Sequence, residues 1–568
     1  MQTRCLDLIL AWHFHQPDYR DYATHEYRLP WTYLHAVKDY SDMAAHLEAH
    51  PNMQVVCNFV PILLDQLEDY ADQFSCDAVR DPLLAALMQP DLDQVTDAQR
   101  DMILDYCFRC NHVTMVRPYP AYHQLAELFQ LAERQGKNAL CYLSGQYLAD
   151  LLTWYHLAWT GETVRRQYPW LLELMKKGCG FSLQDRRSLF QLIGEVVSGL
   201  IPRYRALAES GQVEISTTPH YHPIAPILMD FNAAREAWPE CELPTLPAYP
   251  GGTVRVQRHL DSALHTHTAR FGVPPAGIWP AEGGISTSLV ALFDQSGLSW
   301  SASGEAVLAN SLHAMGAPAA EQRELRYRPY QVKDYATLCF FRDDRLSDMI
   351  GFEYAKWHAN DAVKHFINEL DVILHQTPEH ETPVVSVILD GENAWEYYPY
   401  NGYFFLDELY TALENHPHIH THSFKSYLAT REENLHAPAT GQLPALVAGS
   451  WVYGTFSTWI GVPEKNRAWD LLATAKQQYD KVLVSGALNA AEIEAAEAQL
   501  CDCESSDWFW WFGGYNPRHS VESFDRLYRA NLVQLYVLLK LPVPETLSLP
   551  ISHGGNDAEA GGTMRRAS

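Results

Sequence analysis

Two carboxylic acids stand at the ends of apolar, strand-like segments of the sequence. Glu282 follows the segment from Gly277 to Ala281 and precedes two glycines, which let a ligand approach the backbone closely. Asp390 follows the apolar run from Val384 to Leu389, where a carboxylate is costly unless the position has a use. Two acids facing each other across a bond can cleave a glycoside, because one attacks the anomeric carbon while the other protonates the leaving oxygen. A structural carboxylate is the alternative at each position.

Histidines gather in two further segments. His13 and His15 belong to His-Phe-His-Gln-Pro, and the two-residue period of a strand places both side chains on one face. They could hydrogen bond to sugar hydroxyls, hold a metal ion or serve only the structure. Glu214 ends Gly-Gln-Val-Glu, and His220 and His222 follow it. A carboxylate near histidines can orient a polyol, and a solvated loop glutamate is the alternative.

Aromatic side chains are abundant, with 16 Trp, 31 Tyr and 21 Phe in the chain. Their flat faces suit the stacking of sugar rings. Trp279 and Trp395 lie close in sequence to the two acids, and an apolar pocket around them could raise the pKa of the protonated acid toward neutral. The alternative is that such tryptophans only fill the core.

Short apolar runs rich in β-branched residues alternate with helical patterns. This alternation predicts parallel βαβ units, and so many units in series predict a barrel or a doubly wound sheet. No Gly-x-Gly-x-x-Gly follows the first run, so the nucleotide-binding sheet lacks its phosphate cradle. We therefore predict an α/β barrel with its active site at the carboxyl ends of the strands. The runs are Leu6 to Leu10, Gln54 to Phe59, Val213 to Ser216, Gly277 to Ala281, Leu298 to Ser303, Leu338 to Phe341 and Val384 to Leu389.

A change of pattern near residue 402 predicts a second domain. We expect a catalytic barrel over residues 1–401 and a helical domain over residues 402–548 that contributes to the cleft. Residues 549–568, rich in glycine, alanine and polar types, are expected to form a disordered tail.

Three helices are predicted in the second domain. Pro463 is typical of a first helical turn, and apolar residues recur behind it at steps of three and four. Asn489 with Glu492 three residues later predicts a capping box. The third helix is expected to begin near Ser520 and to end before Pro542.

The composition excludes some partners. Lys and Arg total 42 against 69 Asp and Glu, and the formal net charge of -27 would repel nucleic acids and anionic membranes. No apolar stretch approaches the ~20 residues of a membrane span. The opening residues show no basic region followed by a cleavage site, so we expect a cytoplasmic protein. The 11 Cys lack paired metal spacing and are expected to be reduced. The sequence does not indicate an oligomeric state.

Together these segments resemble glycoside hydrolase family 57 over nearly the whole chain. The family's first region, His-x-His-Gln-Pro, is met at residues 13–17, and its second, Gly-Gln-x-Glu, at residues 211–214. Its third region, Trp-x-x-Glu, contains the nucleophile and falls on Glu282. The fourth reads Leu-Asp-Gly-Glu-Asn-Ala-Trp here, and the resemblance implies that Asp390 is the acid/base. It also implies an incomplete, seven-stranded (β/α)7 barrel followed by a C-terminal helical bundle.

Further segments look like the α-amylase and amylopullulanase branch of the family. They contain Arg342 and Asp344, Trp459, and the pair Trp508 and Trp510. The resemblance implies that these residues bind substrate and that the bundle lends its aromatic segment to the cleft. One departure is Gly-Tyr-Asn at residues 514–516, where acidic or histidine residues are expected, and it puts the acceptor-side specificity in question.

The resemblance implies a retaining hydrolase of α-1,4-linked, and also of α-1,6-linked, glucans such as starch, glycogen or maltooligosaccharides. His13, His15, Glu214, His220 and His222 would hold the sugar hydroxyls, and the tryptophans would stack on neighbouring units. This chemistry needs no cofactor and no metal. Three alternatives stay open: a 4-α-glucanotransferase or branching enzyme with the same acids, a metal-dependent deacetylase or mannosidase with His13 and His15 as ligands, and a non-catalytic glucan-binding protein.

Overall fold

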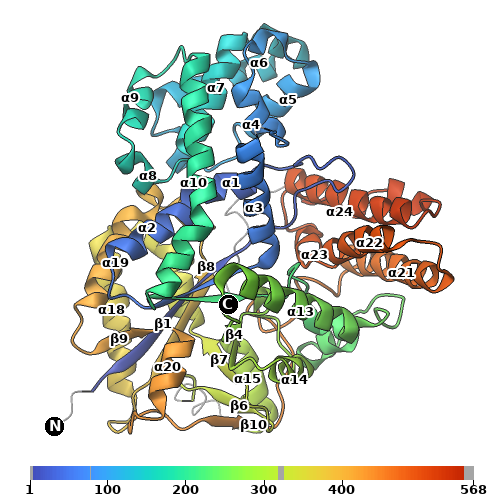
Figure 1. Ribbon diagram of the computed structural model, residues 1–568. Coiled ribbons are helices and arrows are strands. Elements are labelled where there is room, and N and C mark those ends of the chain that lie inside the picture. The colour runs from blue at the N-terminus through green and yellow to red at the C-terminus, as the bar shows by residue number, and fades with distance from the viewer. Residues whose placement is uncertain (1–3, 77, 318–324, 556–568) are drawn as a thin grey trace.

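Seven parallel strands form a barrel at the centre of the molecule (Figure 1). The computed structural model describes residues 4–76, 78–317 and 325–555. Within them, neighbouring barrel strands pair in parallel, and the contact of Arg342 with Ser386 joins the last two. The predicted α/β barrel, incomplete relative to an eight-stranded one, is therefore confirmed. Its strands are β1 (Leu6–Phe14), β2 (Val55–Phe59), β3 (Val213–Thr217), β4 (Gly277–Ile278), β5 (Trp300–Gly304), β7 (Leu338–Arg342) and β8 (Val384–Asp390).

The barrel interior is polar at the carboxyl ends of the strands, and the layers nearer the amino ends are mainly apolar. Successive inward residues of β1 are Ile9, Ala11 and His13, and the first two belong to a buried apolar cluster. His13 is in register with Asn58 on one side and Asp390 on the other, so these three side chains share one layer. The apolar cluster beneath them contains Ile9, Ala11, Val56, Trp279, Trp300, Ala302, Phe340, Val384, Ile388, Phe424 and Tyr427.

Helices connect the strands and cover the outside of the barrel. Between β1 and β2 lie α1 (Trp31–His35) and α2 (Ser41–Ala49), and between β3 and β4 lie α11 (Ala225–Met229), α12 (Ala234–Ala237) and α13 (Gly252–Phe271). The later connections contain α14 (Thr287–Gln295), α15 (Glu305–Ala314), β6 (Tyr330–Val332), α17 (Asp344–Asp348) and α18 (Ala359–Gln376).

A large helical insertion separates β2 from β3 and stands above the barrel in Figure 1. Its long helix α10 (Leu183–Glu209) begins with a capping box between Ser182 and Asp185 and returns the chain to the sheet. The sequence analysis did not separate this insertion from the barrel. The other helices are α3 (Pro61–Cys76), α4 (Pro82–Met88), α5 (Asp97–Tyr106), α6 (Pro120–Arg134), α7 (Gly145–Ala158), α8 (Glu162–Gln167) and α9 (Trp170–Lys177).

The sheet continues past the boundary predicted at residue 402. After α19 (Tyr403–Glu414), β9 (Ile419–His422) pairs with β1, and after α20 (Phe424–Arg431), β10 (Gly441–Leu443) pairs with β6. These strands are short and partly exposed, so they lack the apolar run that marks the barrel strands. The sheet thus extends to residue 443, and the division into two domains stays a prediction.

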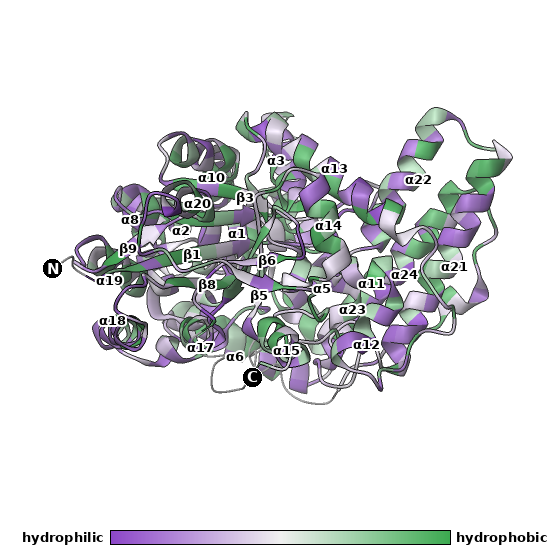
Figure 2. Cartoon of the chain, turned by 90° about the horizontal axis from the view of Figure 1, so that it is seen from below, coloured by the Kyte–Doolittle hydropathy of each residue, from purple (hydrophilic) through white to green (hydrophobic). Residues whose placement is uncertain are grey.

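The helical domain packs beside the barrel and contains α21 (Pro463–Ser485), α22 (Ala490–Cys503), α23 (Asp507–Trp511) and α24 (Arg518–Leu538). Pro463 opens α21 and Asn489 caps α22, as predicted. Figure 2 shows hydrophilic and hydrophobic faces on α21, α22 and α24. None of the helices that the structure describes is both long and apolar enough to cross a membrane.

The predicted tail divides into two parts. Residues 549–555 contact the helical domain: the backbone N–H of Ile551 donates to Asp525 at 2.7 Å, and the backbone N–H of Gly513 donates to the Ser552 hydroxyl at 3.1 Å. Packing of these residues against α24 explains why this part departs from the expected disorder. Residues 556–568 lie outside the described residues.

Candidate active site

Asp390 ends β8 at the polar end of the barrel. Its Oδ2 accepts a hydrogen bond of 2.8 Å from the Asn393 side chain. Burial raises the pKa of Asp390, whereas the hydrogen bond from Asn393 and the nearby His15 and Arg342 lower it. The raised pKa suits an acid that must carry a proton near neutral pH.

Glu282 follows the short strand β4 and has a backbone conformation that is rare for a side-chain-bearing residue. Its φ is 58°, in the left-handed region, and such a conformation persists where the surroundings impose it. Two contacts with Trp451 hold it: the indole N–H donates to Glu282 Oε2 at 2.9 Å, and the Trp451 backbone N–H donates to the Glu282 carbonyl at 3.1 Å. The next residue, Gly283, has no room for a side chain, because a Cβ there would lie 2.9 Å from the Trp279 ring.

Trp451 and Arg342 connect the surroundings of the two acids. The Arg342 guanidinium lies over the Trp451 ring, 5.2 Å from its centroid, while its charge acts on Asp390. Both acids also follow the carboxyl ends of parallel strands, so they stand at the same end of the barrel. The contact between Trp451 and Arg342 thus links the surroundings of the two carboxyl groups.

Arg342, at the carboxyl end of β7, also forms ion pairs with two acids that follow it in the sequence. It pairs with Asp344 at 3.3 Å and with Asp348 at 3.0 Å. Burial raises the pKa of Asp344 to about 7, in spite of the opposing charge of Arg342. These contacts fix the guanidinium between the acids of α17 and the Trp451 ring.

Three histidines form a stack beside Asp390. The rings of His15 and His222 stack with centroids 3.8 Å apart, and those of His13 and His222 are 5.3 Å apart. Burial lowers the pKa of His13 to about 3 and that of His222 well below its usual value, so both rings are neutral near pH 7. Among the described residues, neither His15 Nδ1 nor His222 Nε2 has a hydrogen-bond partner. These nitrogens are available to a ligand.

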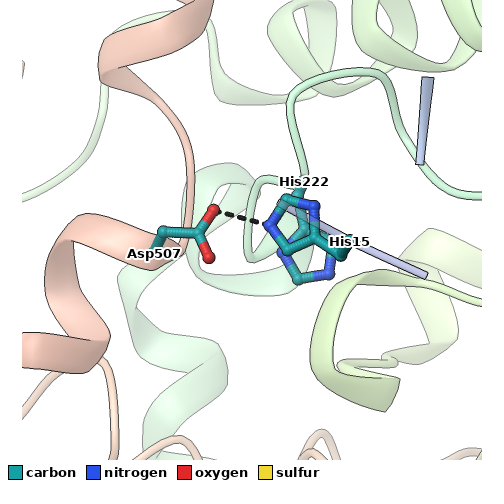
Figure 3. Close-up of side chains that lie close together, drawn as sticks. All are labelled: His15, His222 and Asp507. Atoms are coloured by element: carbon teal, nitrogen blue, oxygen red, sulfur yellow. Dashed lines mark hydrogen bonds and ion pairs between the residues drawn. The ribbon is translucent and has the colours of Figure 1, made fainter. Parts of the chain in front are cut away.

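The helical domain completes this cluster through Asp507. Figure 3 shows its carboxylate directed at the overlapping rings, where His15 Nε2–H donates to Asp507 Oδ2 at 2.8 Å. The neighbouring Ser506 bonds to His222 twice, by its backbone N–H to the carbonyl and through its hydroxyl to Nδ1, each at 3.0 Å. These bonds hold His222 at its left-handed φ of 56°.

The same residues are the strongest candidates for holding a metal ion. One ligand atom each from His15, His222 and Asp507 lie within 4.8 Å of one another. The two imidazole rings stack face to face, with planes only 25° apart, whereas a tetrahedral ion takes ligands that converge on it from different directions. The residue types are those that bind metal ions, but the relative orientation of the two imidazole rings does not suit a tetrahedral ion.

The sequence profile of Glycosyl hydrolase family 57 matches residues 9–438. The chain belongs to this family. Membership confirms the resemblance seen in the four motifs and the predicted class, a glycoside hydrolase. A comparison with curated protein sequences finds no match.

Solved structures of family 57 enzymes share the fold. A branching enzyme from Thermococcus kodakaraensis superimposes with a TM-score of 0.60 at 14% identity, covering 94% of this chain and 90% of that one. A branching enzyme from Pyrococcus horikoshii gives 0.57 at 14% identity, covering 98% of both chains. The α-amylase AmyC from Thermotoga maritima gives 0.54 at 13% identity, covering 95% of this chain and 93% of that one. At sequence identities this low, the structural similarity establishes only a shared fold, the barrel with its helical domain.

Two predicted sugar ligands of this family 57 protein have their polar atoms engaged within the protein. Glu214 is near the start of β3, in register with Val56 and so one inward layer below Asn58, and accepts from Trp300 Nε1 at 2.7 Å and from the Lys425 backbone at 2.8 Å. His220 uses both ring nitrogens, one toward Asp65 at 2.9 Å and one toward Ser262 at 2.8 Å. The position along the strand explains why Glu214 differs from His13 and Asp390. Glu214 is near the first residue of its strand, whereas His13 and Asp390 are at or near the last residues of theirs.

The tryptophans expected to stack on sugars are buried. Trp395 packs edge-on against Trp12 and donates to the Gly391 carbonyl at 2.7 Å, and Trp508 donates to the Asp502 carbonyl at 2.7 Å. These buried rings therefore have no exposed face on which a sugar could stack. The same holds for Trp279, Trp459 and Trp510.

Sequence reasoning did not select four polar groups around the site. Trp451 and Asp507 come from regions after the barrel, and a lone residue in an aromatic segment carries no spacing signal. Asn393 and Glu392 follow Asp390 directly, so their position next to a candidate acid was a usable signal. Glu392 accepts from the His15 backbone at 3.0 Å, and burial, together with the charge of Asp390, raises its pKa well above the usual range.

Proposed function

We propose that this family 57 enzyme cleaves α-linked glucans by double displacement, with Glu282 as the nucleophile and Asp390 as the acid/base. The observation that supports this most is the contact of Trp451, which hydrogen bonds to Glu282, with Arg342, whose charge acts on Asp390. Both acids lie where barrel enzymes place their chemistry.

In the first step, a Glu282 oxygen attacks C1 of a glucosyl unit. The bond from C1 to the glycosidic oxygen breaks, and Asp390 gives its proton to that oxygen. In the second step, Asp390 takes a proton from water while the water oxygen attacks C1 and releases Glu282. Two inversions at C1 return the α configuration.

Histidine nitrogens suit the binding of the sugar. His222 Nε2, on a ring whose lowered pKa keeps it neutral, can bond to a hydroxyl without adding charge next to Asp390, and His15 Nδ1 offers a second position. The His15–Asp507 bond lets the helical domain orient one of these rings. We assign Glu214 and His220 to the support of the fold, because their polar atoms are already engaged.

A glucanotransferase or branching enzyme is the second candidate, since two of the matching solved structures are branching enzymes. The chemistry differs only in the acceptor, which is a glucan hydroxyl instead of water. Products from pure maltotetraose distinguish the two: a hydrolase yields only shorter chains, whereas a transferase also yields longer ones.

The test of the proposal is proton NMR of the first product from a maltooligosaccharide. We expect the α anomer to form first and mutarotation to follow; an initial β anomer would contradict double displacement. Exhaustive chelation addresses the metal-dependent alternative, and we expect it to leave the rate unchanged.

A further inference from the structure

A pocket of about 310 Å³ lies where the loop after β1 meets the helical domain. Its walls come from residues 21–28 of that loop, from α22 and α24, and from Leu547; we call it the loop–bundle pocket. Figure 1 shows this loop, in blue, reaching the red helix α24. Its lining includes none of the residues proposed for catalysis or for the histidine stack.

The lining is rich in planar groups with paired hydrogen-bonding atoms. Gln499 and Asn531 contribute amides, and Arg526 and Arg529 contribute guanidinium groups. Arg529 already donates to Asp525 and to the Leu547 carbonyl, and Asn531 donates to Asp502, so Gln499 and Arg526 are the groups left for sugar hydroxyls. Tyr22 and Leu547 add apolar surface for the ring carbons of a sugar. The volume is at the lower end of the usual range for small-ligand sites, roughly 300–1,000 Å³, so a short glucan segment fits it.

Gln499 is an independent sign that the pocket takes a ligand. The side chain is 0% exposed, and neither amide atom has a hydrogen-bond partner among the described residues. The amide lies beside the Cys503 thiol, which is a weak partner. Buried amides in native proteins are almost always paired with protein or with a bound molecule.

The charges favour a neutral ligand. Arg28 forms an ion pair with Asp21, and Arg529 forms one with Asp525 at 2.7 Å, so two of the three cations are balanced. Among the described residues, no carboxylate lies within ion-pair distance of Arg526, because Glu522, one turn earlier, pairs with Arg518. Arg526 donates its Nε–H to the Glu522 carbonyl at 3.3 Å and keeps its terminal N–H groups for a ligand, while the pocket as a whole has little excess charge.

We propose that the loop–bundle pocket is a second, non-catalytic binding site for a segment of an α-glucan chain. The choice of ligand rests on the proposed function. Two bonds join the pocket to segments that carry residues of the site: the hydroxyl of Tyr22 meets that of Tyr221, next to His222, at 3.1 Å, and Asn531 donates to Asp502 at 2.5 Å, five residues before Asp507. A chain held there stays on the side of the molecule that carries these segments between successive reactions.

The experiment uses the full-length Glu282→Gln protein, which should hold glucans without turning them over. Its retention in a native gel containing soluble starch is compared with that of the same protein carrying Arg526→Ala or Gln499→Met. We expect each change to weaken retention about fivefold, the effect of one lost hydrogen bond. Arg518→Ala, on the same helix but outside the pocket, is the matched control and should change nothing.

Arg526 is exposed, so its variant tests the pocket even if Gln499→Met does not fold. In the active enzyme, Arg526→Ala should leave kcat/KM on maltotetraose unchanged, because that substrate is too short to need the second site. Retention equal to that of the Arg518→Ala control, or binding of inorganic phosphate in place of starch, would overturn the proposal. Starch retention that depends on Arg526 supports the pocket even if the wild-type protein converts no glucan, a result that would refute only the proposed function.

Discussion

Two inward layers of the barrel, the polar rim layer of Asp390 and the apolar layer beneath it, which we call the floor, each contain a buried carboxyl group whose pKa burial raises, and they differ in what surrounds it. At the floor, Glu214 has one oxygen bonded to Trp300 and the other to the Lys425 backbone. At the rim, Asp390 accepts from Asn393 through one oxygen and faces the charge of Arg342. The comparison teaches that burial alone does not mark a reacting acid. A reacting acid is better recognised by its position at the carboxyl end of a strand and by a carboxylate oxygen that is left for the substrate.

The largest predicted effect separates the rim acids from the floor acid. Glu282→Gln and Asp390→Asn should each reduce kcat by about 10³-fold or more, because each removes a group that forms or breaks a bond. Glu214→Gln is the matched control and should leave kcat per folded molecule nearly unchanged. Steady-state rates on maltooligosaccharides check this, and a Glu214 variant as inactive as the Glu282 variant would remove the distinction between the rim and the floor.

The sequence predicted the rim acids but not the difference between rim and floor. Glu282 and Asp390 each follow an apolar run, so strand direction alone places them at exits. Glu214 lies inside its run, near the beginning, and the motif Gly-Gln-Val-Glu does not reveal where the strand starts. The partners of Glu214, Trp300 and Lys425, are 86 and 211 residues away along the chain. No local pattern could indicate such contacts.

In the helical domain, too, local sequence patterns predicted the helices but not the contacts between residues far apart in the sequence. Pro463 and the Asn489–Glu492 box predicted two helices correctly, because caps and turns are local. Asp507 meets His15 across 492 residues, and its place in the site depends on how the domain docks. The strands β9 and β10 were missed because short, half-exposed strands lack a strong apolar period.

A second, smaller effect sharpens the role of Trp451 at the rim. Trp451→Phe removes the hydrogen bond to Glu282 but keeps most of the ring, and we expect kcat to fall about 10- to 100-fold with little change in KM. The matched control is Trp459→Phe, because the Trp459 indole N–H has no hydrogen-bond partner among the described residues. If both variants keep wild-type kcat, Trp451 does not orient the nucleophile.

The pH profile offers a finer test of the rim. Asn393 stabilises the charged form of Asp390 and so lowers its pKa. Asn393→Ala removes that bond, the pKa of Asp390 rises further, and the basic limb of kcat/KM should move up by about 0.5 to 1 pH unit. The rate at alkaline pH then increases relative to the maximum. A shift of the basic limb to lower pH would mean that a group other than Asp390 controls it.

The smallest effect concerns stability at the floor. Glu214→Gln places an amide N–H₂ against one of two fixed donors, so we expect a loss of about 1 to 2 kcal/mol in the free energy of unfolding. Thermal or denaturant unfolding measures this, with the exposed Glu209→Gln as the control. An unchanged stability would show that the floor carboxyl is not needed for the fold.

The most direct test of the central claim is to identify the residue that becomes glycosylated. A ring-fluorinated α-glucosyl fluoride, which forms the glycosyl-enzyme but releases it slowly, is incubated with the enzyme, and the digested protein is analysed by mass spectrometry. The account predicts one added sugar on the peptide that contains Glu282, and no label in the Glu282→Gln protein. A sugar attached to any other carboxylate, Asp390 included, would contradict it.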